Sequence, residues 1–140
     1  MLCLVLHVAG RAGFDFVMRI RHTPVVTFAP ESFDELWPYY VSQHRNKTNR
    51  QLHFIGTTLA LGCVAAAPLY PPALLAAPVV GYGFAWLGHF AFEKNKPATW
   101  GGGRFVLWSL RGDLRMWRHM VAGTMDRVVE QLAGAEAAAL

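Results

Sequence analysis

Charge is the scarcest feature of this sequence. Charged residues make up 16% of its 140 residues and hydrophobic residues 54%, whereas an average soluble domain is roughly 25% charged. Residues 54–92 contain no Asp, Glu, Lys or Arg. Such a chain has ample apolar surface to bury and a formal net charge of +4, which excludes a chain that is acidic or disordered as a whole.

Cysteines and established catalytic motifs are scarce too. Cys3 and Cys63 are too few for a disulfide scaffold, and they lack the Cys-x-x-Cys spacing. There is no His-Glu-x-x-His, Gly-x-Ser-x-Gly or phosphate-binding glycine loop, which argues against nucleotide chemistry and serine hydrolysis. Because the basic residues form no patch with stacking aromatics, we expect no nucleic-acid partner.

The uncharged stretch is interrupted once, at Tyr70-Pro71-Pro72, where proline breaks a helix because it lacks an N–H group. The two arms, residues 52–69 and 73–92, would span about 27 and 30 Å as helices, close to the hydrocarbon thickness of a bilayer. We therefore predict a transmembrane helical hairpin. The alternative is a buried hairpin in a soluble bundle, since Ala and Gly supply much of the apolar character.

Flanking charges indicate an orientation for this hairpin. Basic residues stand only at its outer ends: Arg45, Lys47 and Arg50 before the first arm, and Lys94 and Lys96 after the second. Under the positive-inside rule both ends would face the cytoplasm. The expected location is therefore a multi-pass position in a membrane, the cytoplasmic membrane if the protein is bacterial.

Amphipathic helices are predicted on both sides of the hairpin. Ser32 with Glu35 three residues later fits a capping box that opens a helix leading to His44. From Arg104 onward, apolar residues recur at helical spacing: Leu107, Leu110, Leu114, Trp117 and Val121.

The predicted fold class is thus all-α: a small integral-membrane helical bundle built on a transmembrane hairpin plus amphipathic helices. This helical membrane domain occupies residues 31–133. Residues 1–30 form an N-terminal extension without an assigned element, and residues 134–140 are expected to be a disordered tail.

Three of the six histidines should meet at one end of the hairpin. His53 opens the first arm and His89 closes the second, and a short turn brings His44 to the same end. Glu93 follows His89 by four residues, which puts both on one helix face. Imidazoles with a carboxylate are the ligand set of non-haem Fe(II) oxygenases, and zinc accepts the same donors. A hydrogen-bonded polar cluster without a metal fits the spacing equally well.

Several segments of the chain resemble one known family. They are Tyr-Val-Ser-Gln-His at residues 40–44, Asn-Arg-Gln-Leu-His-Phe-Ile-Gly at 49–56, and Trp-Leu-Gly-His-Phe-Ala-Phe-Glu-Lys-Asn-Lys-Pro-Ala at 86–98. These are similar to the family that contains the fungal 2-hydroxy-fatty-acid dioxygenase of α-oxidation. Residues 109–116 resemble the ending of its bacterial members, although the chain departs from the fungal pattern after Pro97.

The resemblance implies a membrane enzyme that needs Fe(II) and O2 and shortens a 2-hydroxy fatty acid by one carbon. Carried onto this chain, the iron ligands are His44, His53 and His89. Glu93 and Asp113 become the candidate catalytic carboxylates.

In the mechanism that this reading permits, two arginines, Arg50 and Arg45, would attract the substrate carboxylate near the lipid headgroups. The acyl tail would run along the hairpin, among Phe54, Leu59, Phe84 and Trp86. Two other classes stay open at this point: a zinc-dependent membrane hydrolase, and a non-catalytic membrane protein whose histidines only satisfy helix ends.

Overall fold

The computed structural model of the chain describes residues 17–18, 26–27, 30–97, 99 and 103–138. Most of the predicted N-terminal extension lies outside the described residues. Two short strands of that extension are described. They are β1 (Val17–Met18) and β2 (Val26–Thr27), which pair antiparallel with Val17 opposite Thr27.

All other regular elements in the described part of the chain are helical, so the predicted all-α class is confirmed. In chain order they are α1 (Phe33–Ser42), α2 (Lys47–Ala66), α3 (Ala73–Leu87), the π-helical turn η1 (Gly88–Glu93), α4 (Arg104–Val121) and α5 (Met125–Ala138). The last helix covers residues 134–138 of the predicted disordered tail, consistent with the strong helix propensity of its alanines.

Side-chain caps fix where the first two helices begin. Ser32 Oγ accepts a hydrogen bond from the Glu35 N–H group at 3.2 Å, as the capping box predicts. Asn46 Oδ1 accepts from the Thr48 N–H group at 2.9 Å and so caps α2. The cap of α2 leaves His44 in the short connection between the two helices.

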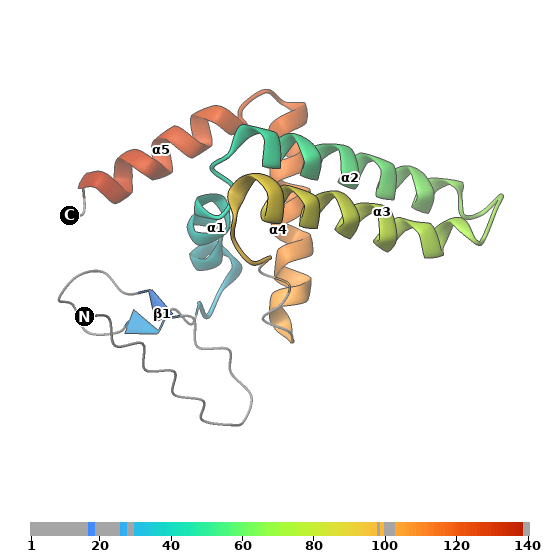
Figure 1. Ribbon diagram of the computed structural model, residues 1–140, viewed down its shortest axis with the longest axis horizontal. Coiled ribbons are helices and arrows are strands. Elements are labelled where there is room, and N and C mark those ends of the chain that lie inside the picture. Colours follow the sequence, from blue (N-terminus) through green and yellow to red (C-terminus); the bar gives the residue numbers. More distant parts are fainter. Residues whose placement is uncertain (1–16, 19–25, 28–29, 98, 100–102, 139–140) are drawn as a thin grey trace.

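Helices α2 and α3 form an antiparallel hairpin that projects away from the other helices (Figure 1). Their backbones approach closely at Gly56. A Cβ atom at that position would lie 2.8 Å from the Phe84 Cβ atom and 3.1 Å from the Gly81 carbonyl oxygen. The absence of a side chain at Gly56 therefore permits the close packing of the two arms.

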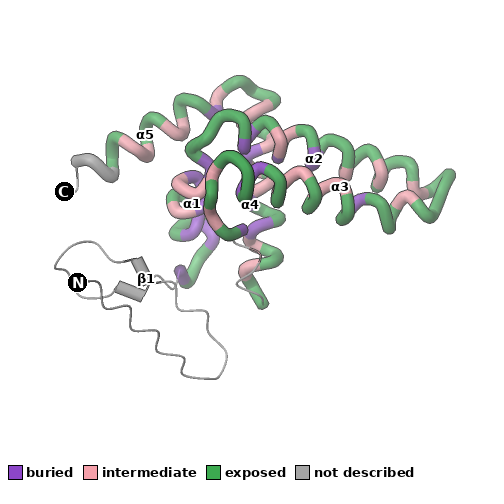
Figure 2. The backbone as a smooth tube through the Cα atoms, viewed as in Figure 1, coloured by how far each residue is buried: buried purple, intermediate pink, exposed green. Residues whose placement is uncertain are grey.

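The buried core lies at the base of the hairpin, where α1 packs against α4 and α5 (Figure 2). Its members are Phe33, Leu36, Trp37, Tyr40, Val41, Met116 and Met125. The outer half of the hairpin is exposed although it is apolar: Leu69 is 93% exposed and Leu75 77%. Of the apolar stripe predicted on α4, Trp117 is half-buried and the other four residues are exposed, because the buried side of that helix is Ser109, Gly112 and Met116.

Only one helix among the described residues, Ala73–Glu93 (α3 and η1 together), is long and apolar enough to cross a membrane. Of its most apolar stretch, 22% is buried inside the protein, whereas the core helix of a soluble protein would be mostly buried. The first predicted arm does not meet this criterion, since α2 begins at Lys47 and includes Arg50 and His53. The prediction of two membrane-crossing arms is therefore supported for the second arm alone.

Candidate metal centre

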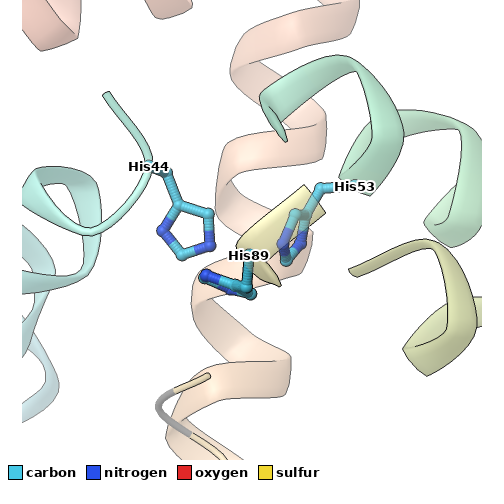
Figure 3. Close-up of side chains that lie close together, drawn as sticks. All are labelled: His44, His53 and His89. Atoms are coloured by element: carbon cyan, nitrogen blue, oxygen red, sulfur yellow. The ribbon is translucent and has the colours of Figure 1, made fainter. Parts of the chain in front are cut away.

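The structure brings His44, His53 and His89 together at the base of the hairpin, and their rings point toward one another (Figure 3). All three side chains are buried. The ring centroid of His44 lies 4.6 Å from that of His53 and 4.7 Å from that of His89, and the last two are 5.1 Å apart. One nitrogen from each ring lies within 4.8 Å of the others, so a single ion could contact all three.

The hydrogen bonds of the three rings define which nitrogen faces this common point. The Nδ1 atom of His44 lies 2.6 Å from the Tyr40 carbonyl oxygen, that of His53 lies 2.7 Å from Asp113 Oδ1, and that of His89 lies 2.7 Å from Asn95 Oδ1. All three partners are acceptors, so Nδ1 is the donor in each ring, and in a neutral ring of this kind the lone pair is on Nε2.

The orientation of the Asn95 amide follows from its other contacts. Asn95 Nδ2 donates to the backbone carbonyl and to the side-chain oxygen of Gln43, both at 3.1 Å. Its oxygen must then face His89. Asn95 thereby links the histidine of η1 to the loop that carries His44.

The lone pairs of the cluster fit a metal ion. The Nε2 atoms of His44 and His53 are buried and have no hydrogen-bond partner in the described part of the chain, which is costly for a polar atom unless something binds it. Histidine ligands in proteins characteristically donate their second N–H to a carboxylate or carbonyl oxygen. Three neutral imidazoles suit Zn²⁺ or Fe(II).

Burial keeps the His44 ring neutral. Desolvation lowers the pKa of His44 well below its ordinary value, and the neighbouring His53 and His89 lower it further. At neutral pH the His44 ring is therefore available as a ligand without first losing a proton.

Asp113 is the acceptor that links α4 to the cluster. Besides His53, its carboxylate accepts hydrogen bonds from Thr57 Oγ1 at 2.7 Å and from the Tyr40 hydroxyl at 3.4 Å. Burial and this carboxylate raise the pKa of Tyr40 well above its ordinary value, so Tyr40 remains a donor. The sequence predicted Asp113 as a catalytic carboxylate, and the structure places it behind the His53 ring.

An apolar cavity of about 410 Å³ opens onto the three histidines between α2, α3 and α4. Its polar lining near the cluster includes Thr57, Asp113 and Ser109. The Ser109 hydroxyl is buried without a hydrogen-bond partner among the described residues.

The geometry agrees with a comparison of the chain against known protein families. Residues 30–125 match the family described as 2-hydroxy-palmitic acid dioxygenase Mpo1-like. The chain belongs to this Mpo1-like family. The match contains all three clustered histidines, and it confirms the resemblance drawn from the sequence. Searches of curated proteins and of solved structures found no match.

Within this Mpo1-like protein, Glu93 is the last residue of η1, and its carboxylate lies against the start of α2. Its carboxylate oxygens accept hydrogen bonds from the backbone N–H groups of Arg45 and Asn46 at 2.9 and 3.0 Å, and from Asn49 Nδ2 at 3.2 Å. The predicted stacking of Glu93 over His89 assumed a regular α-helix. The π-helical turn η1 rotates Glu93 toward the His44 loop instead.

Arg50 is buried beneath the same loop. Its Nη1 atom donates to the carbonyl oxygens of His44 and Arg45, at 3.0 and 2.5 Å, and its Nη2 atom pairs with Asp126 of α5 at 2.7 Å. Neither Arg50 nor the exposed Arg45, the two predicted substrate-binding residues, lines the cavity as the described residues define it. In this structure Arg50 supports the ligand loop.

Sequence reasoning missed Asn95 as a partner of the Mpo1-like cluster. The residue reaches His89 because Lys94 adopts the left-handed conformation, with φ 58° and ψ 35°, and turns the chain back. The available signal in the sequence was an asparagine that follows His89 by six residues. It is a weak one, because asparagine is common in loops.

Proposed function

We propose that this protein is an Fe(II)-dependent dioxygenase that shortens 2-hydroxy fatty acids by one carbon. The observation that carries the proposal is the convergence of three buried imidazoles at the end of an apolar cavity. The family description supports the substrate class. A polar site within an apolar cavity suits a ligand with a polar head and a long aliphatic tail.

We assign the roles at the site as follows. His44, His53 and His89 hold the iron through Nε2, while the Tyr40 carbonyl, Asp113 and Asn95 orient the three rings. Bound Fe(II) would supply the binding of O2 and the oxidative cleavage of the bond between C1 and C2. Glu93 and Arg50 hold the loop that carries His44.

The chain itself orients the substrate and excludes water from it. Ser109 lines the cavity, and its Oγ atom has no partner among the described residues. We assign it a hydrogen bond to the polar head of the substrate, which requires a small rotation of the side chain toward the cavity. The apolar lining beyond it displaces water from the carbons next to the reacting bond, which limits side reactions with water.

A membrane location is part of the proposal. The exposed apolar side chains of the hairpin and the apolar helix Ala73–Glu93 support immersion of the hairpin in lipid. The basic residues at its base would then face the cytoplasm, and with them the metal centre.

One other function is favoured by a specific observation. The donor set at the common point is three imidazoles, which is also the ligand set of catalytic zinc sites that activate water. A zinc-dependent hydrolase built on the same residues is therefore the second candidate.

The deciding experiment is metal analysis of anaerobically purified protein, followed by oxygen uptake on addition of 2-hydroxypalmitate. The dioxygenase proposal predicts about one iron per chain and oxygen consumption coupled to a fatty acid one carbon shorter. His53→Ala and His89→Ala should lose both. A protein that retains zinc and consumes no oxygen would favour the hydrolase, and one that binds no metal would overturn both functions.

A further inference from the structure

The cavity at the metal centre continues as a groove along the hairpin. On α2 its lining residues recur on one helix face, from His53 through Thr57 and Ala60 to Val64. On α3 the matching face is Ala77, Gly81 and Ala85, which leads to His89 in η1. At 1.5 Å per residue, the stretch from His53 to Val64 is about 16 Å long. The groove is therefore long and has the histidines at one end.

The chemistry of the groove changes along its length. Beyond Thr57, its α2 wall consists of Ala60, Leu61 and Val64, and its α3 wall is built of small or apolar side chains except for Tyr82. Leu61, Val64 and Tyr82 are also exposed, so the groove opens sideways onto the apolar surface of the hairpin. An extended aliphatic chain fits such a groove, and a polar ligand would lose its hydrogen bonds to water there.

Midway along the groove, its width depends on two very small residues that face each other. A Cβ atom built at Gly81 has one neighbouring atom within 4 Å, the Ala60 Cβ atom at 3.5 Å. Both residues line the cavity, so a larger side chain at either position would project into it. These residues stand seven and eight positions from His53 and His89, which is about 10 to 12 Å along their helices.

We propose that this groove holds the acyl chain of the substrate and that Gly81 and Ala60 determine how long a chain the protein accepts. The inference rests on the proposed function for the identity of the polar head. This path differs from the one expected from the sequence. Only one of the four residues expected along the acyl tail, Trp86, lines the cavity, whereas Phe54, Leu59 and Phe84 do not. Phe54 instead packs against Trp117.

The test uses leucine substitutions in the full-length protein. Gly81→Leu and Ala60→Leu place a branched side chain in the groove, so long chains should be excluded while short ones still reach the iron. The ratio of kcat/KM for 2-hydroxypalmitate to that for 2-hydroxyoctanoate should fall roughly tenfold or more. Iron content should stay at the wild-type level, because the substitutions lie far from the ligands.

Gly83→Leu is the matched control. It makes the same change in the same helix, but Gly83 does not line the groove and a Cβ atom there meets nothing within 4 Å. Its chain-length profile should equal that of the wild type. A profile unchanged in Gly81→Leu and Ala60→Leu, or shifted equally in Gly83→Leu, would overturn the inference.

A binding measurement separates this inference from the proposed function. Displacement of a fluorescent fatty acid from metal-free protein reports acyl-chain binding without turnover. If the wild type binds long-chain fatty acids and Gly81→Leu does not, the assignment of the groove as the acyl-chain site is supported even when no substrate is oxidised. Absence of acyl-chain binding in the wild type would contradict the groove itself.

Photocrosslinking of the wild type covers the case in which both leucine variants fail to fold. A 2-hydroxy fatty acid with a diazirine at its tail end should label residues of α2 and α3 that line the groove. Labelling confined to other helices would overturn the assignment.

Discussion

At the scale of single residues, the centre is defined by what stands behind each histidine. Three different acceptors, a backbone carbonyl, a carboxylate and an amide oxygen, take the three Nδ1 protons. The Nε2 atom of each ring is then left to face the common point between the three histidines. The strength of metal binding should therefore depend on residues that never touch the metal.

Asp113→Asn tests this dependence. The amide lacks the negative charge that makes His53 a more basic ligand, so metal affinity should fall about 10- to 100-fold, measured by competition with a chelator. Asp34→Asn is the control, because it removes the same charge from a side chain that is 86% exposed and should change nothing. Equal affinities in Asp113→Asn and the wild type would show that Asp113 does not position His53.

Ser109→Ala should separate substrate binding from stability. A buried hydroxyl without a partner costs free energy, so its removal should leave the melting temperature unchanged or raise it. If Ser109 binds the substrate head, KM should rise while iron content stays constant. A lower melting temperature with an unchanged KM would indicate a structural role instead.

The low pKa of His44 predicts how acid affects the metal-free protein. The unfolded chain takes up a proton at this residue near pH 6.5, whereas the folded state does so only at lower pH. The free energy of unfolding should therefore fall as pH drops below about 6.5, by up to about 1.4 kcal/mol per pH unit for this one proton. Denaturant titrations between pH 7 and 5 measure the slope, and His44→Ala should reduce it. Identical slopes would contradict a buried neutral ring.

At the scale of elements, the sequence predicts the gathering of the histidines because it follows from chain direction alone. An antiparallel hairpin returns His89 to the level of His53 whatever the details of packing. The hydrogen-bond partners could not be predicted in the same way. The pairing of Glu93 with His89 assumed α-helical spacing, and one π-helical turn replaces that pairing with Asn95. Such a turn depends on tertiary contacts at its end, which a single sequence does not reveal.

The hairpin itself should depend on one glycine. Gly56→Ala places a Cβ atom 2.8 Å from the Phe84 Cβ atom, so the arms must separate, and this should outweigh the gain of about 1 kcal/mol in helix propensity. Gly62→Ala makes the same change in the same helix with nothing within 4 Å and should stabilise the protein slightly. Thermal unfolding followed by circular dichroism compares the two. Equal stability of both variants would show that the arms are not closely packed at Gly56.

At the scale of the whole molecule, the charged residues and the buried core lie at the base of the hairpin, and the hairpin beyond the base carries no charged residue. The base holds the buried core, the histidine cluster and the basic residues, whereas the far half of the hairpin exposes apolar side chains (Figure 2). A water-soluble protein of this size seldom leaves so much apolar surface uncovered. In the proposed membrane location, the open side of the groove would face the lipid.

Cysteine labelling tests this arrangement in vesicles. Cys63 lies on the outer half of α2. In a Cys3→Ser background, a membrane-impermeant maleimide should therefore not modify it until detergent is added, because the reagent does not enter the hydrocarbon of the bilayer. The orientation is tested with Lys47→Cys, which introduces a cysteine at the exposed base in a background that carries Cys3→Ser and Cys63→Ser. This cysteine should react with the maleimide in inside-out vesicles and not in right-side-out ones, because the base is expected to face the cytoplasm. Rapid labelling of Cys63 in intact vesicles of both orientations would place the hairpin in water. Labelling of Lys47→Cys in right-side-out vesicles would reverse the orientation while leaving the hairpin in the membrane.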